Sequence, residues 1–65
     1  MTSRELLRLL RRRGAVVVTD RGKGGHVLVE LNGRRAYVPT GSGDIKRGTL
    51  FGILRTLAVR PEELR

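Results

Sequence analysis

The stretch HVLVELNGRRAYVP, residues 26–39, consists of two alternating runs on either side of Asn32-Gly33. An Asn-Gly pair between such runs is the strongest short signal for a two-residue hairpin turn, because both turn residues need a positive φ. A turn of this length fixes the register of the hairpin, so that Leu28 faces Tyr37. The stretch therefore predicts two antiparallel strands, and the rest of the fold is built around them.

The alternation gives the hairpin two different faces. One face is apolar and is expected to pack against helices: Val27, Val29, Ala36 and Val38. The other face carries the only histidine of the chain with apolar and charged neighbours: His26, Leu28, Glu30, Arg35 and Tyr37. We therefore expect His26 on the open face of the sheet, beside the glycine-rich segment that precedes it.

The segments around the hairpin predict two helices and a third strand. Residues 2–5 fit a capping box with Thr2 at the N-cap, and Gly14 is a typical helix end. The β-branched segment AVVVTD, residues 15–20, predicts a strand. A second helix begins between residues 45 and 49, and PEELR at the end of the chain predicts one last turn. The second helix carries an apolar stripe: Leu50, Ile53, Leu54, Leu57 and Ala58.

The simplest arrangement stacks both helices on the apolar face of the sheet. We therefore predict an α+β fold with two layers in the order α-β-β-β-α, a three-stranded antiparallel sheet and both helices on one face. Residues 1–65 show no linker or repeat and are expected to form a single domain. A chain of this size buries only about 60% of its unfolded surface, so its chemistry is expected on a surface or in a shallow groove.

The charge of the chain points to a polyanionic partner. Fourteen Lys and Arg face six Asp and Glu, which gives a net charge of +8, and twelve of the fourteen are arginine. The planar guanidinium group suits phosphate oxygens, so RNA or DNA is the simplest partner. An incidental charge on a structural domain is the alternative. The run Arg11 to Arg13 also has two interpretations, as a complement to the helix dipole or as a phosphate contact.

Composition excludes several classes of protein. The chain has no cysteine, which excludes disulfides, thiolate catalysis and zinc ribbons. With a single histidine we expect no metal site and no cofactor. The longest apolar run, residues 15–18, is too short to span a bilayer, and the N-terminus has no apolar signal core. We therefore expect a cytoplasmic protein without membrane contact.

His26 is the candidate catalytic residue, because an imidazole can both take and give a proton near pH 7. RNA cleavage needs a base for the 2′-hydroxyl, an acid for the leaving oxygen and positive charge near the phosphorane, so one His with cations is sufficient. The alternative is a solvated surface histidine. The candidate RNA- and phosphate-binding residues are Arg21, Lys23, Gly24, Gly25, Arg35 and Lys46. The chain has only two aromatic residues, so recognition through base stacking is not expected.

The segments GKGGHVLVELNGRRAYVP, residues 22–39, and GDIKRGTLFGILRTLAV, residues 43–59, resemble the HicA-type mRNA interferase toxins. The resemblance extends from Ser3 to Val59 and depends on Gly25-His26, Val-Pro at residues 38–39 and Gly-Thr-Leu at residues 48–50. It implies a double-stranded-RNA-binding-type fold and a metal-independent endoribonuclease that cleaves mRNA. It also implies a HicB-type antitoxin as partner, and it matches the family's catalytic histidine to His26.

The chain departs from the family pattern at two positions. Gly41 stands where members often have a second histidine, and Ala15 stands where an aromatic residue is frequent. Three functions therefore remain open. The first is a toxin endoribonuclease with His26 as general acid or base, and the second is a non-catalytic RNA-binding module of the same fold. The third is a small structural or partner domain whose charge is incidental.

Overall fold

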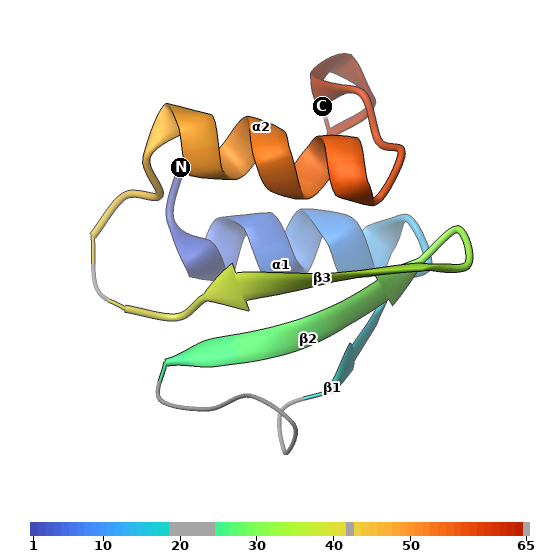
Figure 1. Ribbon diagram of the computed structural model, residues 1–65, viewed down its shortest axis with the longest axis horizontal. Helices are drawn as coiled ribbons and strands as arrows, with labels where there is room; N and C mark the ends of the chain where they lie inside the picture. Colours follow the sequence, from blue (N-terminus) through green and yellow to red (C-terminus); the bar gives the residue numbers. More distant parts are fainter. Residues whose placement is uncertain (19–24, 42, 65) are drawn as a thin grey trace.

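In a computed structural model of the protein, which describes residues 1–18, 25–41 and 43–64, two helices cover one face of a three-stranded sheet (Figure 1). The strands are antiparallel and lie in the order β1-β2-β3, as in a meander. This confirms the predicted α+β fold with both helices on one face. The elements are α1 (Ser3–Arg12), β1 (Val16–Val18), β2 (His26–Leu31), β3 (Arg34–Pro39), α2 (Arg47–Thr56) and the short 3-10 helix η1 (Pro61–Leu64).

The hairpin between β2 and β3 has the predicted turn and register. Asn32 and Gly33 have φ of 58° and 70°, which is typical of a type I′ turn. Leu28 pairs with Tyr37 as predicted. In the same register, residue 27 pairs with residue 38 and residue 31 pairs with residue 34. The side-chain amide of Asn32 donates a hydrogen bond of 2.9 Å to the carbonyl oxygen of Leu57, which attaches the turn to the end of α2.

The core lies between the sheet and the two helices. The inner face of the hairpin contributes Val29 and Val38, which are fully buried, together with Ala36. The two helices and the C-cap of α2 add leucines and one isoleucine, and each fully buried side chain of this size contributes about 1.5–3 kcal/mol. These residues are Leu6, Leu10, Ile53, Leu54 and Leu57. Three buried residues outside the periodic patterns complete the core, Ile45, Val59 and Leu64.

The start of α1 is the predicted capping box. The backbone N–H of Glu5 donates to the Thr2 hydroxyl over 3.2 Å, and the backbone N–H of Thr2 donates to the Glu5 carboxylate over 3.1 Å. This reciprocal pair satisfies two backbone donors that would otherwise lack partners. The helix therefore begins where its sequence signature predicts.

The end of α1 shortens the predicted first strand. Gly14 has a φ of 97°, and the N–H groups of Gly14 and Ala15 donate to the carbonyls of Arg11 and Leu10 over 2.9 and 3.0 Å. These two bonds form a Schellman motif. Because the N–H of Ala15 closes the helix, β1 begins at Val16. The sequence had predicted that this strand begins at residue 15. The last two residues of that predicted strand lie outside the described residues.

The second helix begins inside the predicted window, at Arg47, and also ends in a Schellman motif. Here Ala58 has a φ of 57°, and the N–H groups of Ala58 and Val59 donate to the carbonyls of Arg55 and Leu54 over 3.1 and 2.8 Å. The expectation that Ala58 belongs to the apolar stripe is wrong. The chain reverses at this residue and leaves its methyl group exposed, while the next residue is buried.

The N-terminus is tied to the segment that follows β3. The hydroxyl of Ser3 donates to the carbonyl oxygen of Pro39, the last residue of β3. The backbone N–H of Ile45 donates to the carbonyl of Met1 over 2.8 Å, and the terminal amine lies 3.3 Å from the Asp44 carboxylate. The end of β3 is thus held by contacts with the start of α1.

Candidate functional site

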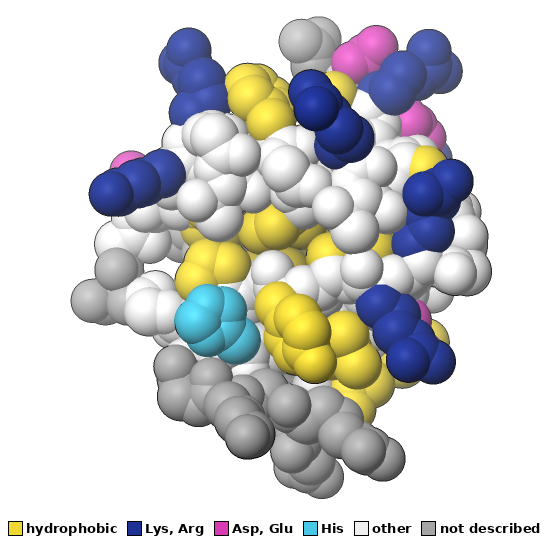
Figure 2. Space-filling view, viewed as in Figure 1, with side chains coloured by type: hydrophobic (Ala, Val, Ile, Leu, Met, Phe, Trp, Pro, Cys, Tyr) yellow, Lys and Arg dark blue, Asp and Glu magenta, His cyan; other side chains and the backbone are white. Residues whose placement is uncertain are grey.

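The only histidine lies at the start of β2, where the structure leaves its side chain exposed. His26 pairs with Pro39, the last residue of β3, so it occupies one end of the hairpin. Figure 2 shows the imidazole in the open, beside a group of hydrophobic side chains. The prediction that His26 is not a core histidine is confirmed by this exposure.

Two hydrogen bonds to backbone carbonyls hold the strand ends at His26. The N–H of Thr40 donates to the carbonyl oxygen of Gly25, the residue before His26. The Ser3 hydroxyl donates to the carbonyl of Pro39, on the opposite strand. Gly25 has a φ of 90°, a conformation that favours glycine. The position of the imidazole is therefore set by Gly25 on one side and by the start of α1 on the other.

The outer face of the sheet carries apolar side chains next to His26. Leu28 and Tyr37 form a cross-strand pair on this face, and 57% of Tyr37 is exposed. The register of β1 places Val16 and Val18 on the same face, which the sequence could not predict because the pairing of β1 was unknown. A hollow of about 520 Å³ lies here, lined by Val18, Leu28, Glu30, Arg35 and Tyr37. We call this surface, together with His26, the His26 face.

Arg35 lies on the His26 face but away from His26. Its Nε atom is 3.0 Å from the Glu30 carboxylate, and 74% of its side chain is exposed. Arg35 pairs with Glu30 across the hairpin, four positions along β2 from His26, which corresponds to about 13 Å.

Lys46 lies in the helical layer, directly before α2. It is exposed and occupies the N-cap of α2 without a side-chain cap bond, and the first turn of the helix has no acidic residue. α2 begins at the end of the molecule where β2 begins and β3 ends (Figure 1). The partial positive charge of a helix N-terminus adds to that of the lysine, which favours an anion. The sequence missed this contribution because it did not fix the first residue of the helix.

The remaining candidate residues are only partly described. Gly25 adjoins His26, as stated above, whereas Arg21, Lys23 and Gly24 lie outside the described residues. Gly41, which replaces the second histidine of the family pattern, is exposed. It lines a hollow of about 370 Å³ together with Thr2, Ser3, Arg4, Thr40 and Gly43.

Two classes of site receive no support from the described residues. No three His, Cys, Asp or Glu side chains lie together in the described ranges as ligands for a metal ion. In the same part of the chain, each helix is too short or too polar to cross a membrane.

Comparison with known proteins agrees with the resemblance noted in the sequence. Among curated proteins no match is found. The family described as HicA toxin of bacterial toxin-antitoxin matches residues 3–59, which is most of the 65-residue chain. The matched range includes both helices, all three strands and the His26 face. The chain therefore belongs to the HicA toxin family of bacterial toxin–antitoxin systems.

Proposed function

We propose that this toxin is an endoribonuclease that cleaves mRNA without a metal ion, with His26 as the general acid or base. The observation that carries the proposal is an exposed imidazole at a glycine turn, on the open face of a HicA-family fold. The net charge of +8 supports RNA as the partner. Since its substrate is mRNA, we expect the toxin to act in the cytoplasm.

The reaction uses the nucleophile that RNA itself supplies. His26 takes the proton of the 2′-hydroxyl, whose oxygen bonds to phosphorus while the bond to the 5′-oxygen breaks. The leaving 5′-oxygen takes a proton from the imidazolium or from water, which yields a 2′,3′-cyclic phosphate and a 5′-hydroxyl. Cations and backbone N–H groups stabilise the charge of the phosphorane. The groups proposed for this role are Lys46, Arg21, Lys23, Gly24 and Gly25, whereas Arg35 holds a neighbouring phosphate.

Incubation of the purified toxin with a long RNA in EDTA tests this reaction. We expect cleavage that leaves cyclic phosphate ends, and we expect His26→Ala to be slower by at least about 100-fold. RNA binding by His26→Ala serves as the control, because the imidazole contributes little to backbone affinity. Wild-type activity that is lost in EDTA, or retained in His26→Ala, would contradict the proposal.

Gly41 favours a second candidate, a non-catalytic RNA-binding module. Without the second histidine of the family pattern, the imidazole of His26 must both accept the proton of the 2′-hydroxyl and protonate the leaving oxygen, or water must perform one of these transfers. Binding of RNA by the wild type without any cleavage in the same assay would support this candidate. An affinity that does not fall with rising salt would contradict both, because phosphate contacts release counterions.

We further propose that a HicB-type antitoxin binds the His26 face and thereby covers the imidazole. The apolar side chains of Leu28, Tyr37 and Val16 suit a protein interface, and the basic charge of the chain suits an acidic partner. Tyr37→Glu is expected to weaken the toxin–antitoxin complex more than Thr56→Glu, which places the same charge on the outer side of α2. A complex in which His26 remains fully accessible would exclude inhibition by direct coverage.

A further inference from the structure

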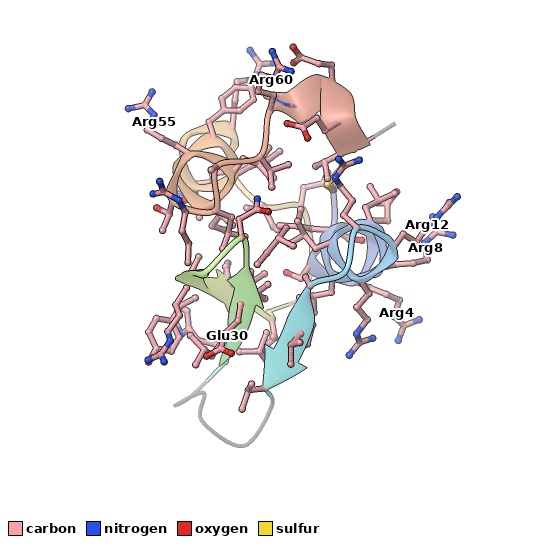
Figure 3. All side chains as sticks on the ribbon, turned by 90° about the vertical axis from the view of Figure 1, so that its right-hand side faces the viewer. Arg4, Arg8, Arg12, Glu30, Arg55 and Arg60 are labelled. Carbon is pink, nitrogen blue, oxygen red and sulfur yellow. The ribbon has the colours of Figure 1, made fainter. Side chains whose placement is uncertain are left out.

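Three arginines form a row along α1 that the proposed reaction does not use. Arg4, Arg8 and Arg12 are spaced by four residues, and all three are exposed. Figure 3 shows their side chains projecting from α1 on the side away from α2 and β3. Successive members are about 6 Å apart along the helix axis. We call these three residues the arginine ridge.

The requirements of folding do not explain the arginine ridge. Arg12 lies in the last turn, where a cation complements the helix dipole, but Arg4 lies in the first turn, where a cation opposes it. Like charges four residues apart also destabilise a helix. Among the described residues, no carboxylate forms an ion pair with the ridge. The only acidic side chain of α1, that of Glu5, accepts its hydrogen bonds from Thr2.

The ridge and the His26 face point in different directions. The imidazole is seen from the front of the molecule in Figure 2. Figure 3 turns the molecule so that this front lies to the left, and there the ridge projects to the right. The open side of the sheet, marked by Glu30, lies at the lower left of that view. The ridge therefore runs away from the imidazole along α1, and only its first member, Arg4, lines the same hollow as Thr40 and Gly41 near the His26 end of the hairpin.

The chemistry of the ridge fits a phosphate backbone better than a protein partner. Guanidinium groups bind phosphate oxygens through paired hydrogen bonds, and regular steps along a helix suit a chain of regularly spaced charges. A protein interface instead needs an apolar centre. The large exposed hydrophobic residues of the described ranges are Met1, Val16, Tyr37 and Phe51, and none of them belongs to α1.

We propose that the arginine ridge is a second RNA-binding surface, which holds the phosphate backbone of the substrate independently of the His26 face. This inference rests on the proposed function, since the ligand of the ridge is the RNA that the His26 face cleaves. The ridge supplies affinity without sequence preference, and the His26 face supplies the chemistry. RNA bound at the ridge remains on the toxin between encounters with the imidazole.

Binding of a fluorescent single-stranded RNA tests the ridge, with His26→Ala as the parent so that the probe is not cleaved. The ridge variant combines Arg4→Gln, Arg8→Gln and Arg12→Gln. The matched control combines Arg34→Gln, Arg55→Gln and Arg60→Gln, which removes the same charge from other exposed positions. We expect about tenfold weaker binding by the ridge variant near 0.1 M salt and a salt slope that is smaller by about 2. The control should change much less.

The other outcomes separate this inference from the proposed function. Equal losses in the ridge and control variants would show a general effect of net charge and would overturn the ridge. Polyglutamate serves as a second probe, which stands for an acidic protein. If the ridge variant loses polyglutamate binding but keeps RNA binding, the ridge binds an acidic protein, and the proposal that it binds RNA is overturned. If the parent fails to bind RNA, the proposed function fails together with the ridge. Thermal unfolding tests whether the ridge variant is folded. We expect its Tm to equal or exceed that of the parent, because the substitutions remove repulsion between like charges on α1.

Discussion

Gly25 determines how the chain enters β2 at His26. Its φ of 90° belongs to the left-handed region, and its carbonyl accepts the hydrogen bond from Thr40. Among the described residues, a Cβ atom at this position would meet the Thr40 hydroxyl oxygen, at 3.9 Å, and no other atom within 4 Å. The backbone conformation and not a lack of space therefore requires glycine here. A side chain at residue 25 would therefore strain the backbone directly before His26.

Gly25→Ala is expected to lower the free energy of unfolding by about 1–2 kcal/mol, because alanine is strained at this φ. Thermal unfolding should show this as a decrease in Tm of several degrees, and cleavage should fall as the direction of His26 changes. Gly41→Ala is the matched control, since its Cβ has open space and its φ lies outside the left-handed region. Equal Tm values for the two variants would contradict the conformational argument.

Gly41→His tests whether the missing second histidine limits the reaction. Among the described residues, a Cβ at Gly41 has no neighbour within 4 Å, and Gly41 is exposed, so the first atom of a side chain meets open space here. The residue follows Thr40, which is bonded to Gly25 beside His26, so a second proton carrier would stand near the first. We expect RNA cleavage to become about tenfold faster. Gly41→Gln controls for size, and cleavage no faster than in this variant would show that the second imidazole is not limiting.

At the scale of elements, the sequence predicted those features that neighbouring residues determine. The Asn-Gly turn fixed the β2–β3 register, and with it the exposure of His26, because a two-residue turn leaves no freedom of pairing. The same register also determines the separation between Arg35 and His26 along the hairpin. The pairing of β1 was not predictable, since a longer connection separates it from β2. The placement of Lys46 was not predictable either, since it follows a connection from β3 whose path the sequence does not specify. The reversal of the chain at Ala58, just after α2 ends at Thr56, was missed because a left-handed alanine has no sequence signal.

The capping box of α1 predicts a stability that depends on pH. The backbone N–H and the hydroxyl of Thr2 donate to the Glu5 carboxylate and lower its pKa from the ordinary 4.5. A lowered folded pKa contributes stability above the ordinary value, and this contribution is lost as pH falls below about 4.5. We expect Tm to fall on acidification through this range, and Glu5→Gln to reduce that dependence. Glu62→Gln is the control, and an acid response unchanged in Glu5→Gln would contradict the assignment.

At the scale of the whole molecule, the two layers separate two kinds of surface. The sheet leaves an open side with the imidazole and apolar side chains, which suits both a scissile phosphate and an inhibitor. The helical layer turns the arginine ridge of α1 to another side (Figure 3). A protein with principal extents of 28 × 23 × 18 Å cannot enclose an RNA chain, so the proposed function requires RNA affinity and chemistry to be distributed over its outside.

The absence of cysteine allows each surface to be blocked separately. Tyr37→Cys carrying a bulky maleimide group covers the His26 face, and we expect cleavage to fall by about 100-fold while RNA affinity changes little. Arg8→Cys with the same label blocks the arginine ridge and should weaken RNA binding, with Arg8→Gln as its charge control. Thr56→Cys, on the outer side of α2, should change neither property when labelled. If the label at residue 37 removes RNA binding as completely as cleavage, both functions share one face, and the separation of surfaces is wrong.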